Sequence, residues 1–220
     1  MTLPLALRNR LAELILDALS DEAARESLGV LAAVCADAAS IAPDRLPERF
    51  PRELVEQHGG RLKLKEAWAP HAVELGERSG RAWRALDPHP LDPPDAPLPV
   101  ALEAARRLFD ARLYFEVHEQ LEPYWMRAQG AEREALQGLI QIAVGLQHLA
   151  NGNVQGARAL LHDGAAKVLD RRLAGIDLDA FGRSITGCLD QVLALGPDAA
   201  ARFDWDLVPA LPAHRRGRRV

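Results

Sequence analysis

Apolar residues in this chain recur at the spacing of an α-helix, and this periodicity constrains the fold more than any other feature. Near the start they stand at Leu11, Leu14, Ile15, Ala18 and Leu19. This three-and-four spacing places them on one face of a helix. Alternating strand patterns do not recur, and the helix formers Ala, Leu, Arg and Glu dominate the chain. The sequence therefore predicts an all-α fold.

A run of prolines divides the helical pattern. Residues 87–99 read DPHPLDPPDAPLP and hold six prolines, which exclude a helix or a sheet and are typical of an extended linker. We therefore expect four parts: an N-terminal helical region at residues 1–87, a proline-rich linker at 88–99, a helical bundle at 100–195 and an extended tail at 196–220.

Composition excludes several classes of protein. Hydrophobic residues make up 48% and charged residues 26% of the chain, as in ordinary soluble domains. The net charge of −4 gives no general attraction to nucleic acid or to an anionic membrane. Neither a membrane helix nor a secretory leader is expected. Cys35 and Cys188 lie in apolar helical patterns, so we expect free thiols and a cytoplasmic location.

In the N-terminal region the pattern predicts helices over about residues 5–19 and 22–39, with Ser20 or Asp21 as the cap of the second. A short helix over about 52–58 is expected to stop at Gly59-Gly60. A longer helix follows over about 61–86. Pro70 lies inside it, so we expect a kink or break near Ala69.

The second half has a clearer pattern. Helices are predicted over about residues 100–110, 114–127, 132–150, 153–172 and 177–195, with Asn153 and Asp177 as caps. Short turns between them indicate antiparallel helix pairs, similar in outline to tetratricopeptide repeats. The tail is expected to lie extended across the helices and to cover an apolar groove. Its basic end, HRRGRR at 214–219, is expected to be solvated.

Candidate functional residues gather on the predicted helix YFEVHEQLEPYW. Glu122 and Trp125 follow His118 by four and seven positions, so the three share one face, which we expect to be buried. Glu119 lies at the edge of this face. Because an unpaired buried carboxylate is costly, Glu122 needs a partner or a metal. The opposite side is expected to face solvent and carries Glu116, Gln120 and Arg127.

The next helix carries a polar stripe that includes Gln141 and His148. Antiparallel packing would set this stripe against His118 and Glu122. Imidazole and carboxylate groups are ligands for Zn²⁺, Mn²⁺ or Fe²⁺. The metal hypothesis therefore takes His118, Glu122 and His148 as ligands. Glu119 would act as a general base on a metal-bound water, and Gln141 would contact the substrate or a ligand.

Two alternatives to a metal stay open. HExxE is not the HExxH pattern of zinc metalloproteases, and no ExxH pair accompanies it. The same residues can instead form a buried polar network, in which Gln141 and His148 satisfy the His118–Glu122 pair. Catalysis without a metal, or a pocket for a small ligand, is the second alternative.

Several separated motifs in the second half resemble the DUF309 family. They occur in order over about Ala101–Leu195. The matching positions are His118, Glu119, Glu122, Trp125, Gly138, Leu139, Gln141, Ala143, His148, Asn153, Gly156 and Ala157. The family consists of small all-helical bacterial and archaeal proteins of unknown function that have been labelled predicted metal-dependent hydrolases. The resemblance implies the same fold and a similar activity here.

Two functional hypotheses follow. The first is a metal-dependent hydrolase with the ligand set above, in which Trp125, Gln141 and Asn153 also line the site. The second is a non-enzymatic helical binding or scaffold module built around the polar network. A small molecule or a protein is the expected partner, nucleic acid is not expected, and a homo-oligomer is compatible with either hypothesis.

Overall fold

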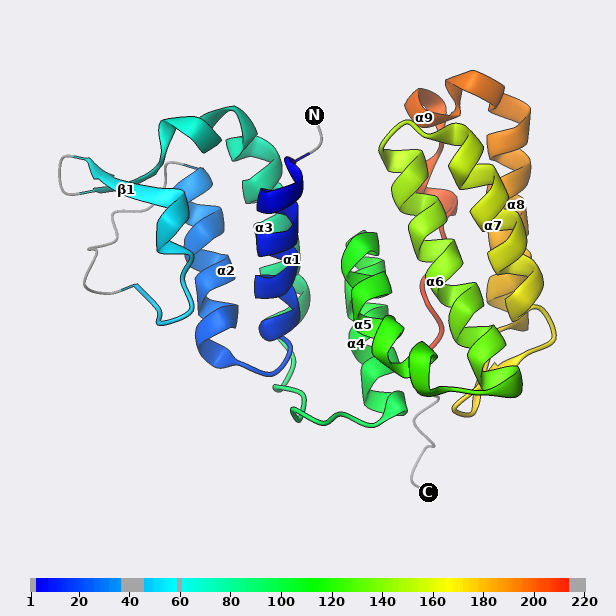
Figure 1. Ribbon diagram of the computed structural model, residues 1–220. Coiled ribbons are helices and arrows are strands. Elements are labelled where there is room, and N and C mark those ends of the chain that lie inside the picture. Colours follow the sequence, from blue (N-terminus) through cyan, green and yellow to red (C-terminus); the bar gives the residue numbers. More distant parts are fainter. Residues whose placement is uncertain (1–2, 37–45, 59–60, 214–220) are drawn as a thin grey trace. The chain divides into compact units, whose positions relative to one another are not determined.

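Helices make up most of the structure, a computed structural model that describes residues 3–36, 46–58 and 61–213 (Figure 1). The all-α expectation is confirmed, because the strands in the described residues form only two short antiparallel pairs. Within that same part of the chain, no helix combines the length and the apolar character needed to cross a membrane. The chain divides into two units, Met1–Asp95 and Ala96–Val220.

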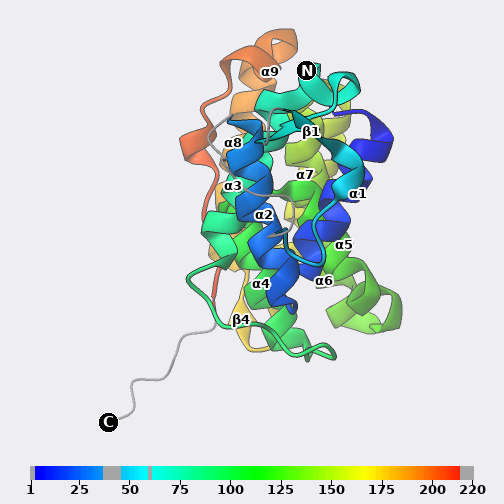
Figure 2. The same ribbon diagram turned by 90° about the vertical axis from the view of Figure 1, so that its left-hand side faces the viewer.

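The first unit packs α1 (Leu5–Asp17) and α2 (Glu22–Cys35) with α3 (Ala72–Leu86), and Figure 2 presents α1, α2 and the strand β1 to the viewer. Its core is leucine-rich, as the helical spacing predicts. The fully buried side chains include Leu7, Leu11, Leu14, Ile15, Leu28, Leu31, Leu75 and Leu86. Asp21 is the N-cap of α2 and accepts a 3.1 Å hydrogen bond from the Ala24 amide, which holds the pKa of its carboxyl below the ordinary value.

A β-hairpin stands where the sequence predicted helix. A 3-10 helix, η2 (Arg52–Leu54), leads into β1 (Val55–His58), which pairs antiparallel with β2 (Arg61–Leu64). Only two residues, Gly59 and Gly60, separate the strands in sequence. A Gly-Gly pair between short segments is a hairpin signal as well as a helix stop, and the helical interpretation was wrong. A second 3-10 helix, η3 (Glu66–His71), contains Pro70, and regular α-helix begins only at Ala72.

The start of the proline-rich segment is tied to the first unit. Arg25 is buried and donates a 2.6 Å hydrogen bond from Nη1 to the His89 carbonyl. The Asp92 amide donates to the Leu19 carbonyl at 2.8 Å. At the other end, α4 (Leu98–Asp110) begins inside the segment expected to be linker. Pro99 fits there because the first turn of a helix tolerates proline.

The second unit contains α4, α5 (Tyr114–Arg127), α6 (Gly130–Ala150), α7 (Val154–Val168) and α8 (Asp179–Leu195). Consecutive helices pack against each other, and α6, α7 and α8 run side by side in Figure 1. The end of the predicted helix over 153–172 is wrong. A two-residue hairpin of β3 (Arg172–Leu173) and β4 (Ile176–Asp177) replaces it, with Ala174 and Gly175 at positive φ in its turn.

Glycines allow α6 and α7 to cross closely. A Cβ on Gly164 would stand 2.8 Å from the Gly138 carbonyl oxygen and 2.9 Å from the Ile142 amide nitrogen. A Cβ on Gly138 would stand 2.7 Å from Val168 Cγ1. Contacts this short are with backbone or packed core atoms, so both positions need glycine for close approach.

The tail beyond α8 is less extended than predicted. It contains the 3-10 helices η4 (Gly196–Asp198) and η5 (Trp205–Leu207) and the short α9 (Ala199–Arg202). Phe203 and Leu211 are buried, and the Leu211 amide donates a 3.1 Å hydrogen bond to Asp110 at the end of α4. The basic segment 214–219 lies outside the described residues.

Enlarging Gly164 should separate α6 from α7. We expect Gly164→Ala to destabilise the protein by about 1–3 kcal/mol, because an added methyl overpacks a tight helix crossing. Gly187 is the matched control: it is exposed in α8 and a Cβ there meets nothing within 4 Å. Gly187→Ala should stabilise by about 0.5–1 kcal/mol through helix propensity. Chemical denaturation of both variants measures the change in the free energy of unfolding. Equal changes in the two variants would contradict a close approach of α6 and α7 at Gly164.

The cysteines should react slowly with thiol reagents. Burial raises the pKa of the Cys35 thiol to about 12 and that of Cys188 to about 11, which removes the reactive thiolate near neutral pH. Labelling of the native protein at pH 8 should be roughly 100-fold slower than labelling of the unfolded chain. Above the thiol pKa of the unfolded chain, ionisation favours unfolding, so stability should fall as pH rises. Labelling of the folded protein at the unfolded rate would contradict the burial.

Candidate metal site

Helix α5 carries the candidate residues and packs against α4 on one side and α6 on the other. The side chains that it buries are Tyr114, Glu116, Val117 and Leu121. On a helical wheel of about 100° per residue, this arc is centred near Val117, about a quarter turn from His118. His118 therefore lies at the edge of the buried face and not in its middle.

Two expectations about burial are wrong. Glu122 and His118 were expected inside the core, but the exposed fractions of their side chains are 38% and 28%. Glu116 was expected in solvent, but it is fully buried. The wheel correctly groups residues by face, but it assumes one buried face. Packing against two neighbouring helices turns and widens the buried arc of α5. Glu122 thus needs no buried partner.

Glu116 is the carboxylate that the fold buries. Helix α4, one of the two helices that pack against α5, carries the buried Arg107. Both charged groups have interaction partners, and Arg107 Nε also donates a 3.3 Å hydrogen bond to the Glu103 carbonyl. A buried carboxylate left without a partner would cost several kcal/mol. The burial of Glu116 was not predicted from the sequence, because the periodicity of α5 does not show that two helices pack against it.

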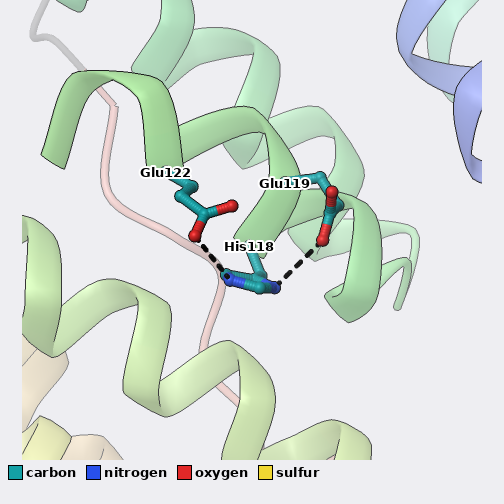
Figure 3. A group of neighbouring side chains, drawn as sticks. All are labelled: His118, Glu119 and Glu122. Carbon is teal, nitrogen blue, oxygen red and sulfur yellow. Dashed lines mark ion pairs between the residues drawn. The ribbon is translucent and has the colours of Figure 1, made fainter. Parts of the chain in front are cut away.

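His118 stands between two carboxylates of its own helix (Figure 3). Its Nδ1 lies 3.3 Å from Glu119 Oε1, and its Nε2 lies 4.0 Å from Glu122 Oε1. Glu119 follows directly in sequence and Glu122 follows one turn later, so the helix brings one carboxylate to each edge of the ring. The Phe115 ring meets the imidazole edge-on, with centroids 6.3 Å apart.

The three residues form a group that fits a metal ion. One ligand atom from each of His118, Glu119 and Glu122 lies within 4.8 Å of the other two. Two ligands on one ion are roughly 4 Å apart at most, because each bond to the ion is about 2.0–2.2 Å. Glu119 lies at Nδ1 and Glu122 at Nε2, so both carboxylates would have to turn toward one ring nitrogen of His118 to share an ion with it. Among the described residues, this is the group of three or more His, Cys, Asp or Glu with such geometry.

His148 is not part of this group. It lies in the last turn of α6, where its Nδ1 is 2.9 Å from Asn153 Nδ2. Asn153 is the N-cap of α7, as predicted, and its Oδ1 accepts a 2.9 Å hydrogen bond from the Gly156 amide. His148, predicted as a metal ligand, and Asn153, predicted to line the site, thus contact each other where α6 connects to α7. Glu119, predicted as a base, takes the third place in the group.

Gln141 and Trp125 are the remaining predicted site residues. Gln141 Oε1 and Trp125 Nε1 are buried and make no hydrogen bond to the described part of the chain. Gln141 therefore does not join His118 and His148 in the predicted network. Trp125 packs beneath a cation, since the Arg133 guanidinium carbon lies 4.2 Å from its ring centroid. Arg133 carried no signal in the sequence, because this contact crosses between two helices.

Two cavities of the second unit lie away from the His118 group. An open groove of about 820 Å³ is lined by residues of α7 and α8, among them Arg158, His162 and Leu193. A smaller cavity of about 240 Å³ lies beside Arg112 and Trp205. Neither is lined by the His118 group. The side chains of the group are partly exposed to water, by 28% for His118, 36% for Glu119 and 38% for Glu122.

Asn153 should act through the helix cap. Asn153→Ala removes the acceptor for the Gly156 amide and should cost about 1 kcal/mol of stability. Asn153→Asp keeps that acceptor but loses the amide donor next to His148, so it should stay near the wild-type stability. Thermal unfolding of both variants measures the difference. Equal losses would show that the contact with His148 dominates.

The one family match that the comparisons give falls within the second unit. No curated protein and no solved structure matches this chain. A family model described as "Domain of unknown function (DUF309)" matches residues 102–160, from within α4 to within α7. The match includes the whole of α5 and α6, and so the His118 group. It confirms the resemblance of the second half of the sequence to the DUF309 family.

Proposed function

We propose that this protein is a metal-dependent hydrolase whose divalent ion is held by His118, Glu119 and Glu122. The observation that carries the proposal is the convergence of one imidazole and two carboxylates within 4.8 Å on one helix. This donor set suits Zn²⁺, Mn²⁺ or Fe²⁺. The resemblance to DUF309 points the same way, because that family has been labelled as predicted hydrolases.

The position of each residue on α5 determines how it would contact the ion. His118 and Glu122 stand one turn apart on the same face, so they hold the ion from one side. Glu119 closes the third position from the edge of that face. All three candidate ligands come from α5, so a bound ion would keep positions for water and substrate. A bound divalent ion lowers the pKa of a coordinated water and polarises the bond to be cleaved.

Hydrolysis at such a site needs a place for one proton. Water loses a proton as its oxygen bonds to the substrate's electrophilic centre, and the leaving group takes a proton as its bond breaks. A carboxylate beside the water can carry that proton. The oxygen of Glu119 that does not hold the ion would be suited to this, because 36% of the side chain is exposed at the rim of the group.

The alternative of a binding module built on a buried network has less support. The His118 group is half-exposed, and His148 hydrogen-bonds to Asn153. The buried Gln141 Oε1 makes no hydrogen bond in the described residues. The network hypothesis needs these residues to satisfy one another away from water.

Metal titration of the purified protein tests the proposal. We expect about one Mn²⁺ or Zn²⁺ ion per chain, and His118→Ala should weaken binding by at least about 100-fold because it removes a direct ligand. Glu119→Gln and Glu122→Gln should each weaken it by at least about 10-fold. Isothermal titration calorimetry gives the stoichiometry and the affinity.

His148→Ala is the matched control, since it removes a histidine of the same unit that lies outside the group. It should change the metal affinity by less than about 3-fold. The proposal is wrong if the wild-type protein binds no ion in the micromolar range. It is also wrong if His148→Ala abolishes binding and His118→Ala does not.

A further inference from the structure

The groove between α7 and α8 is a feature of the second unit that the proposed metal site does not use. Its volume is about 820 Å³, within the range of about 300–1,000 Å³ that is common for small-molecule sites. Figure 1 shows the two helices side by side, and they pack against each other. None of His118, Glu119 and Glu122 lines the groove, so a ligand can bind there independently of a metal ion.

Apolar residues make up most of the lining of the groove. They include Val154, Ala159, Leu189, Leu193 and Pro197. Leu193 is 46% exposed, so a large part of this hydrophobic side chain is in water. A ligand that covers such a surface removes apolar area from water, which favours binding. The groove therefore favours a ligand with a hydrocarbon body.

One charged group of the groove has no partner. Arg158 is exposed on α7 and makes no hydrogen bond or ion pair to the residues that the structure describes. The other charged or titratable groups of the lining are His162 and Asp163, and they contact each other, with His162 Nδ1 3.1 Å from Asp163 Oδ1. Arg158 is thus a single cation that a ligand can meet. A guanidinium matches a carboxylate, a single negative charge, through two parallel N–H···O bonds.

The charged and the apolar parts of the groove lie on opposite walls. Arg158 belongs to α7 and the exposed Leu193 belongs to α8. The axes of packed helices are about 8–10 Å apart, so one small molecule can touch both walls. Such a molecule carries an anionic group at Arg158 and a hydrocarbon chain along Leu193.

We propose that this groove binds a free amphipathic carboxylate, in which the carboxylate group is carried on an unbranched alkyl chain. Arg158 binds the carboxylate, and the apolar walls with Leu193 bind the chain. Both parts of the ligand are needed. A short carboxylate lacks the chain, and an alkyl cation meets Arg158 with a charge of the same sign.

Decanoate is the probe, titrated by calorimetry into the full-length protein at concentrations too low for micelles. We expect one site per chain with a Kd below about 1 mM. Acetate has the charge without the chain, and decyltrimethylammonium has the chain with the opposite charge. Each should bind at least about 10-fold more weakly than decanoate. Vesicles that contain anionic phosphatidylglycerol test a membrane surface as the source of the same chemistry, and they should not bind the protein.

Two pairs of variants test the two walls. Arg158→Gln should weaken decanoate binding at least about 10-fold, whereas Arg127→Gln removes an exposed arginine outside the groove and should stay within about 2-fold. Leu193→Ser should weaken binding at least about 3-fold. Its control is Leu207→Ser, because Leu207 is 47% exposed but does not line the groove.

Melting temperatures of all four variants identify a loss that is due to unfolding. The comparison of decanoate with decyltrimethylammonium uses the unaltered protein, so the test stands even if a substitution destabilises the fold.

Several results would overturn the inference. One is a wild-type protein that does not bind decanoate, and another is decyltrimethylammonium bound as tightly as decanoate, because apolar contact alone then explains the binding. Equal losses in a variant and its control would show that the groove is not the site. Binding to anionic vesicles without binding to free decanoate would assign the surface to a membrane instead. None of these results bears on the metal site, which Mn²⁺ titration tests separately.

Discussion

The packing of α5 between α4 and α6 determines what the second unit can do. Helix α5 buries Tyr114, Glu116, Val117 and Leu121 between these neighbours, and the Tyr114 ring also stacks on Trp205 of η5. The same helix carries His118, Glu119 and Glu122, which a single helix turn brings together. Because the three side chains share one helix, no loop is needed to bring them together. The close glycine crossing of α6 and α7 secures the support on the side of α6.

Periodicity predicted the elements well where one rule acted alone. The spacing of apolar residues gave α5 its observed bounds, and the side-chain chemistry of Asp21 and Asn153 predicted their caps. The hairpin at 55–64 shows where two rules compete. Gly59-Gly60 is compatible with a helix stop and with a tight turn between strands, and the short apolar segments beside it do not distinguish the two.

Of the three predicted ligands, His118 and Glu122 lie in the candidate group and His148 does not. His118 and Glu122 do share a face with Trp125, as helical geometry requires. The wheel did not reveal which face is buried, because that depends on a second packed helix that local sequence does not encode. As a result, Glu122 was predicted to be buried and Glu116 to be exposed, whereas the structure shows the reverse. For the same reason, patterns within single helices did not predict the contacts between helices. Examples are Arg133 with Trp125 and His148 with Asn153.

Anomalous diffraction from a crystal soaked in Mn²⁺ or Zn²⁺ tests the central claim most directly. The account predicts one strong peak at α5, about 2.0–2.3 Å from a ring nitrogen of His118 and from oxygens of Glu119 and Glu122. Rotation of the two carboxylates toward one ring nitrogen of His118 should accompany it, with the backbone of α5 unchanged. A fully occupied peak at other residues, or no peak beside His118 at saturating metal, would contradict the account.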